Sequence, residues 1–193
     1  MKSKLLMIAA AANLSMASVP AVAGTEDVMM QNYMFALVEP WITDDVIIDA
    51  IRAQNDAHAA LTNDEITALD TAWRAEADAG HGATIDPVLT SAVSDVLRAK
   101  LAESDGVITE IFIMDNKGLN VATSGVTSDY WQGDEDKFSA TFGKGPGTTL
   151  VGELEMDDST GKMQGQVSMT ITDPVTGAAI GAVTAAFVAD SLM

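Results

Sequence analysis

The sequence predicts an α+β domain in which helices from the N-terminal half pack on a five-stranded antiparallel sheet from the C-terminal half. Over residues 24–106 apolar residues recur with a helical period, and capping residues, glycine or proline separate the runs. Over residues 107–193 the period changes to two, with turn sequences between the runs. A run of helices followed by a run of strands is typical of this fold class.

The composition restricts the function classes. The 193 residues include 28 acidic and 10 basic side chains, so the formal net charge is −18. Hydrophobic residues make up 48% of the chain, which is enough to bury a core. Nucleic acid and anionic membranes both require clustered Lys and Arg, so the acidity argues against either partner. The chain has no cysteine, which excludes disulfides, thiolate metal sites and cysteine nucleophiles.

Residues 1–23 are organised like an export signal. Lys2 and Lys4 precede an apolar stretch over residues 5–12, and residues 21–23 form an A-x-A cleavage site. We expect cleavage there, which gives a periplasmic or secreted protein that is not embedded in the membrane. The alternative is an uncleaved anchor, although the strongly apolar part is shorter than the roughly 20 residues that span a bilayer.

The predicted helices of the N-terminal half are bounded by caps, glycine or proline. Pro40 ends or kinks the first helix, and Thr62 with Glu65 forms a capping box that begins the third. Asp86 followed by proline begins the fourth, which we expect to continue to Gly106. The expected ranges are 26–39, from about residue 44 onward, 62–80 and 86–106.

The predicted strands cover residues 107–114, 119–123, 150–156, 163–172 and 178–188. The first is almost continuously apolar and the last is apolar on both faces, as expected for inner strands. In the third strand we expect Leu150 and Leu154 on one face and Val151 on the other, because strand side chains alternate. Residues 129–142 have no regular period, which predicts a loop.

Two segments resemble extracytoplasmic Cache (PAS-like) sensor domains. The sequence IFIMDNKGLNVA at residues 111–122 is similar to their first hairpin, where a buried strand ends in Asp and returns after a Gly turn. Residues 170–183, with Asp173, Gly177 and Gly181, are similar to their closing hairpin. The resemblance covers residues 26–191 and implies a PAS-like sheet that receives a small molecule beneath a covering loop.

The resemblance also implies a role in signal transduction. Typical members continue through a transmembrane helix into an output module, whereas this sequence ends at Met193. We therefore expect a stand-alone sensor that signals through a separate membrane receptor, kinase or transporter. The alternatives are an interaction module that lacks a ligand pocket and an acid-dependent hydrolase.

The candidate ligand site combines the loop over residues 129–142 with the polar face of the fourth strand. The resemblance indicates residues 128–137 as a ligand-facing loop, and its aromatic and charged side chains suit a pocket wall. The alternatives are aromatic residues that cap the sheet edge, a solvated strand face and a turn-forming Asp173. The candidate ligand-binding residues are Tyr130, Trp131, Asp134, Asp136, Lys137, Gln166, Ser168, Thr170 and Asp173.

The charge distribution favours a cationic or neutral ligand. No arginine follows Arg98, and arginine is the usual bidentate partner of carboxylates. We expect an amine or amino acid whose ammonium group lies near Asp134, Asp136 or Asp173. A small organic acid held by Lys137 is the alternative.

We expect no catalytic site, metal site or cofactor, and therefore no enzyme. The sequence contains no G-x-S-x-G motif and no Ser-His-Asp order. His58 and His81 have no metal-ligand spacing, so surface or capping roles are predicted for both.

Overall fold

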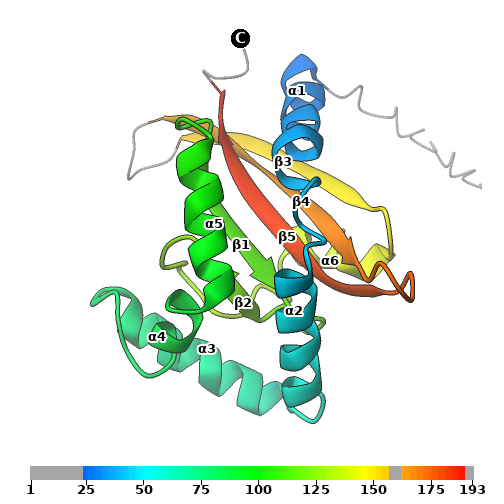
Figure 1. The fold of residues 1–193 in the computed structure, drawn as a ribbon. Helices are drawn as coiled ribbons and strands as arrows, with labels where there is room; N and C mark the ends of the chain where they lie inside the picture. Colours follow the sequence, from blue (N-terminus) through cyan, green and yellow to red (C-terminus); the bar gives the residue numbers. More distant parts are fainter. Residues whose placement is uncertain (1–23, 157–161, 190–193) are drawn as a thin grey trace, which may run out of the picture.

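The computed structural model describes residues 24–156 and 162–189. The expected signal peptide, residues 1–23, lies outside the described residues, as do two short parts of the expected sheet region, 157–161 and 190–193. Within the described part, no helix combines the length and apolar character that crossing a bilayer requires. The helices come first and the strands last, which confirms the predicted α+β class (Figure 1).

The sheet has five strands in the order β2-β1-β5-β4-β3, and every neighbouring pair is antiparallel. The strand that comes last in the sequence, β5, is therefore the central one. The strands are β1 (Ile108–Met114), β2 (Asn120–Thr123), β3 (Thr149–Met156), β4 (Met163–Thr172) and β5 (Ala179–Val188). All five match the predicted ranges to within two residues at each end.

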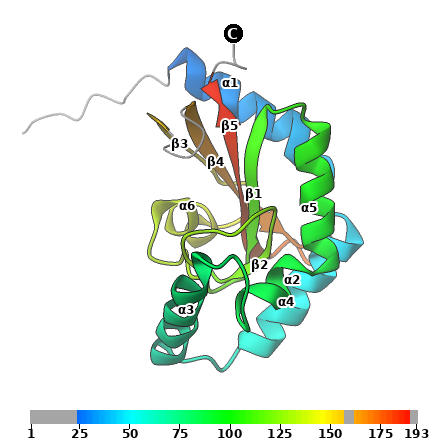
Figure 2. The same cartoon turned by 90° about the vertical axis from the view of Figure 1, so that its left-hand side faces the viewer.

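Helices cover both faces of the sheet, but unequally. Helices α1, α2 and α5, which we call the larger sheet-covering helices, lie on one face and the short α6 on the other (Figure 2). The main core lies between the larger sheet-covering helices and the sheet and includes Met34, Ile51 and Phe187. The helical elements are α1 (Thr25–Tyr33), the π-helix η1 (Met34–Val38), α2 (Asp45–His58), α3 (Asn63–Ala77), α4 (Ile85–Leu89), α5 (Ala92–Glu103), α6 (Asp136–Ser139) and the 3-10 helix η2 (Phe142–Lys144).

The N-terminal helix boundaries follow their local signals, with one exception. The predicted capping box is present, because the Thr62 N–H donates to Glu65 Oε2 over 2.8 Å and the Glu65 N–H donates to Thr62 Oγ1. The single helix predicted over 86–106 is wrong, since the chain forms α4 and α5 instead. Ser91 is extended, and its hydroxyl accepts a hydrogen bond from the Ser94 N–H, so it begins a second helix as an N-cap.

A β-bulge changes the faces of β3. Val151 is opposite Val167, and Leu154 is opposite Gly165, with a register shift between the two pairs. Both side chains consequently pack against the main core. The expectation that Val151 and Leu154 lie on opposite faces is therefore wrong, because a bulge adds a residue and interrupts the alternation.

Gly118 lies in the turn of the β1–β2 hairpin, and Gly177 lies in the turn of the β4–β5 hairpin. Of the two, only Gly118 has neighbouring atoms that leave no space for a side chain. Both have positive φ angles, +83° and +72°. A Cβ on Gly118 would lie 2.6 Å from the Gly133 backbone, whereas one on Gly177 would meet nothing within 4 Å. We expect Gly177→Ala to lower the free energy of unfolding by about 1 kcal/mol and Gly118→Ala by about 2 kcal/mol or more, as measured by urea denaturation. Equal losses would show that the contact with Gly133 carries no cost.

Candidate functional site

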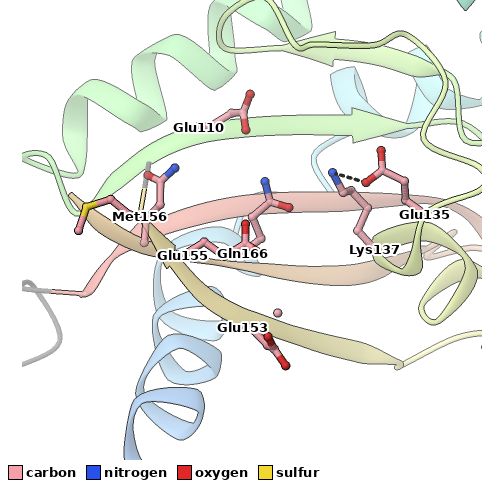
Figure 3. Close-up of a pocket in the computed structure, with 9 residues that line it drawn as sticks. Glu110, Glu135, Lys137, Glu153, Glu155, Met156 and Gln166 are labelled. Atoms are coloured by element: carbon pink, nitrogen blue, oxygen red, sulfur yellow. Dashed lines mark ion pairs between the residues drawn. The ribbon is translucent and has the colours of Figure 1, made fainter. Parts of the chain in front are cut away.

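An open cavity of about 450 Å³ lies on the sheet face opposite α1 and α2 (Figure 3). It extends over β1, β4 and β3 and reaches the start of α6. Acidic side chains dominate its wall. The lining residues are Glu110, Glu135, Lys137, Gly152, Glu153, Glu155, Met156, Gln164 and Gln166.

Strand pairing brings these side chains together. Glu110 on β1 and Gln166 on β4 are both opposite Ala186 on the central strand. Directly opposite residues share a face of the sheet, so the two polar side chains lie on either side of a small one. Glu155 on β3 is opposite Gln164 and continues the polar surface to the sheet edge. The small Ala186 between longer neighbours accounts for the hollow.

Among the described residues that line the cavity, four carry a carboxylate and one, Lys137, carries a positive charge. Lys137 Nζ lies 2.9 Å from Glu135 Oε2 and 5.5 Å from the centroid of the Phe112 ring. Gln164 Oε1 accepts a hydrogen bond from the Thr109 hydroxyl over 2.8 Å. Carboxylates act as acceptors when ionised, so the excess negative charge favours a ligand that donates hydrogen bonds and carries positive charge.

The structure places two of the nine predicted ligand residues, Lys137 and Gln166, in this cavity. Two more, Ser168 and Thr170, lie further along the same face of β4 but are buried. The Ser168 hydroxyl is 2.9 Å from that of Thr184, and Thr170 Oγ1 has no hydrogen-bond partner among the described residues. At these two positions the polar face is buried rather than solvated, whereas Gln164 and Gln166 are partly exposed.

The predicted aromatic residues pack elsewhere. Tyr130 stacks on Trp73 of α3 with ring centroids 5.2 Å apart, and the Trp131 indole N–H donates to the Lys117 carbonyl oxygen over 2.8 Å. Asp70 Oδ1 accepts hydrogen bonds from both backbone N–H groups. These contacts hold the loop against α3, and neither side chain lines the acidic cavity. The ligand role of both residues stays a prediction.

The three predicted aspartates also lie outside this cavity. Asp134 and Asp136 are solvent-exposed. Asp173 is buried, and one of its oxygens accepts hydrogen bonds from Arg52 Nε at 2.9 Å and from Arg52 Nη2 at 2.7 Å. Its other oxygen accepts from the backbone N–H groups of Val175 and Thr176, as in an Asp-Pro turn. Ligand contact by these aspartates likewise stays a prediction.

The Asp173 ion pair predicts a pH dependence. Hydrogen bonds from Arg52 and then from the Thr176 backbone lower the pKa of Asp173 below its ordinary value. A lowered folded-state pKa stabilises the fold above the unfolded pKa of about 3.9, and this contribution is lost as the pH falls through the folded value. We expect the melting temperature to fall below about pH 4 and to fall less steeply in Arg52→Gln. Parallel curves for the two proteins would contradict this role.

The sequence contained partial signals for the cavity residues that the prediction missed. Glu110 interrupts an otherwise apolar strand, and Glu153 and Glu155 are two positions apart in another. Glu135 lies in the predicted loop. Nothing in the spacing indicates that these glutamates share a site, because they come from separate segments that only the strand order brings together.

The described residues form no group of three or more His, Asp or Glu side chains placed to hold a metal ion. The cavity is an acidic surface lined by side chains from β1, β3, β4 and the start of α6. Hydrogen bonding and charge are the means of recognition that its side chains offer.

The comparisons with known proteins identify the fold. No family model matches the sequence, and no curated protein matches it. The E. coli DcuS sensor domain is 12% identical with a TM-score of 0.51, and the alignment covers 87% of this chain and 94% of that one. This likeness confirms the Cache-type sensor-domain fold that the resemblance implied.

Two other similar structures are more distant. The sensor domain of the V. cholerae histidine kinase DctB is 11% identical with a TM-score of 0.46, and the alignment covers 87% of this chain and 55% of that one. The ligand-binding domain of the Campylobacter jejuni chemoreceptor Tlp3, in complex with L-valine, is 10% identical with a TM-score of 0.40. The alignment with the Tlp3 domain covers 87% of this chain and 64% of that one. This chain therefore spans less than two thirds of the DctB domain and of the Tlp3 domain.

Proposed function

We propose that this protein is an extracytoplasmic sensor domain that binds a small molecule bearing a protonated amine. The acidic cavity on the sheet face opposite α1 and α2 is the observation that carries the proposal. The Cache-type fold, shared with the DcuS sensor domain, supports a sensory role. The export signal expected at residues 1–23 supports a location outside the cytoplasm.

The side chains around the cavity suit an ammonium head group. An ammonium has N–H donors in several directions, and the cavity offers carboxylates from β1, from β3 and from the start of α6. The Gln166 amide lies between Glu110 and the β3 glutamates and can orient the ligand. Lys137 favours amino acids among the amines, because its ammonium can exchange Glu135 for a ligand carboxylate.

The site is well placed to influence the helical face. A ligand in the cavity contacts β1, β4 and β3, and the opposite face of the same strands packs against α1 and α5. Packed cores transmit small displacements. A ligand that draws these strands together would therefore change how α1 and α5 pack on the sheet. We propose that a membrane receptor, kinase or transporter reads this change.

A thermal-shift screen of the exported protein tests the proposed function. The panel contains alkyl diamines, amino acids and dicarboxylic acids. We expect amines to raise the melting temperature by about 5–10 °C at one hundred times the dissociation constant, and dicarboxylic acids to have no effect. Stabilisation by dicarboxylic acids alone would contradict the charge argument. A panel without any hit would favour the interaction module instead.

A further inference from the structure

A second cavity, of about 290 Å³, lies among α2, α3, α4 and β2 and shares no lining residue with the first. These elements gather at the lower end of the molecule in Figures 1 and 2. The wall is partly apolar, with Leu69, Val88 and Val121, and partly polar, with Gln54, His58 and Tyr130. None of the described residues that line it is Lys, Arg, Asp or Glu, in contrast to the acidic cavity.

A buried carboxylate behind the wall fixes the orientation of two polar residues. Asp115 is 0% exposed, and its Oδ2 lies 2.7 Å from His58 Nδ1 and 3.1 Å from Gln54 Nε2. Its Oδ1 accepts hydrogen bonds from the backbone N–H groups of Lys117 and Leu119. The other three partners of this carboxylate are all donors, and we assign the donor role at Nδ1 to His58 as well. In the neutral imidazole, Nε2 then carries a lone pair on the far edge of the ring.

Gln54 and Tyr130 complete the polar part of the wall. The Gln54 amide nitrogen also donates to the carbonyl oxygens of Leu119 and Asn120, which leaves Oε1 as the amide's acceptor. Burial and the nearby Asp115 charge raise the pKa of Tyr130, so its phenol remains protonated. His58 and Gln54 therefore line the cavity as residues that can accept, through Nε2 of the neutral imidazole and through Oε1, beside one neutral hydroxyl.

We infer that this second cavity binds a small, uncharged and largely apolar molecule that has one O–H donor, in the class of single-ring alcohols and phenols. The donor bonds His58 Nε2, and the ring lies against the apolar wall. The volume is at the lower end for ligand pockets, which suits one ring. A charged group would lose hydration without gaining an ion pair, because no lining side chain carries an opposite fixed charge. This inference does not depend on the amine site.

Phenol and anisole test the inference directly. They share the aromatic ring, but methylation removes the donor of anisole. Titrations of the exported protein are followed by the imidazole 15N signals of His58. We expect phenol to shift the Nε2 signal. We expect anisole to bind about tenfold more weakly than phenol, because it lacks one hydrogen bond. Equal binding of the two compounds, or an unmoved His58 signal at saturating phenol, would overturn the inference.

Two variants locate the phenol site. Ala83 lies exposed at the rim, so Ala83→Phe obstructs the cavity without entering the core. His58→Phe keeps a ring but removes the acceptor. We expect each variant to weaken phenol binding about tenfold and to leave amine binding at the acidic cavity unchanged. Wild-type phenol affinity in Ala83→Phe would contradict the site, even if His58→Phe failed to fold. If a variant lost amine binding but kept phenol binding, the result would count against the proposed function at the acidic cavity.

Discussion

Replacing Asp115 with alanine is expected to lower the free energy of unfolding by about 4 kcal/mol, the largest single-residue effect on stability in this account. The carboxylate is fully buried and accepts hydrogen bonds from His58, from Gln54 and from two backbone N–H groups. Its removal leaves the His58 donor and the two backbone N–H groups without this acceptor in the interior, which costs more than the hydrogen bonds themselves contribute. It also removes two of the side-chain hydrogen bonds that join the end of α2 to the β1–β2 hairpin.

Urea denaturation of the wild type and of two variants measures this effect. Asp136→Ala is the matched control, because it removes an exposed carboxylate from α6 and should change stability by less than about 0.5 kcal/mol. We expect the melting temperature of Asp115→Ala to fall by about 10 °C. A loss below about 1 kcal/mol would show that the donors find other partners and that this network does not hold α2 to the sheet.

Neutralising two cavity glutamates is expected to weaken amine binding about a hundredfold. Glu110→Gln and Glu155→Gln act on strands at opposite sides of the cavity and keep side-chain size. Each substitution removes one charge-assisted acceptor, worth about tenfold in affinity, and sites on separate strands should be roughly additive. Isothermal titration of the strongest amine in each single variant and in the double variant gives the two factors and their product.

The matched control for this experiment is Asp134→Asn with Asp136→Asn. It changes the net charge by the same amount on the neighbouring loop, but neither aspartate lines the cavity. We expect less than a twofold effect at physiological ionic strength, because salt screens exposed charges. If the control variant bound the amine as weakly as the glutamate double variant, the overall acidity of the protein would attract the amine, and the cavity would not bind it.

The fold was largely predictable because its signals are local. Capping boxes, glycine turns and the change of hydrophobic period depend on neighbours a few positions away, and they gave the predicted strands and most of the helix boundaries. The errors arose where a local pattern allowed two outcomes. Ser91 can continue a helix or cap a new one, and the segment from Val151 to Leu154 can alternate regularly or form a bulge.

The candidate site was less predictable because it depends on strand order. Periodicity correctly placed Gln166 on a polar strand face, but it cannot state that Glu110 lies across β5 from it. Likewise a surface or capping role was predicted for His58, since its partner Asp115 is remote in the sequence. Trp131 was assigned to a pocket from its residue type and from the family resemblance, and its ligand role stays a prediction; in the structure its loop packs against α3.

The most direct test of the amine site is NMR of the exported protein with 13C-labelled methionine methyl groups. Met156 lines the acidic cavity, whereas Met30 and Met34 are buried on the other face of the sheet. Met156→Leu assigns the first signal. The proposal predicts that the strongest amine shifts the Met156 methyl resonance in proportion to occupancy and leaves those of Met30 and Met34 nearly unchanged. An amine that binds while the Met156 resonance stays in place would contradict binding in this cavity.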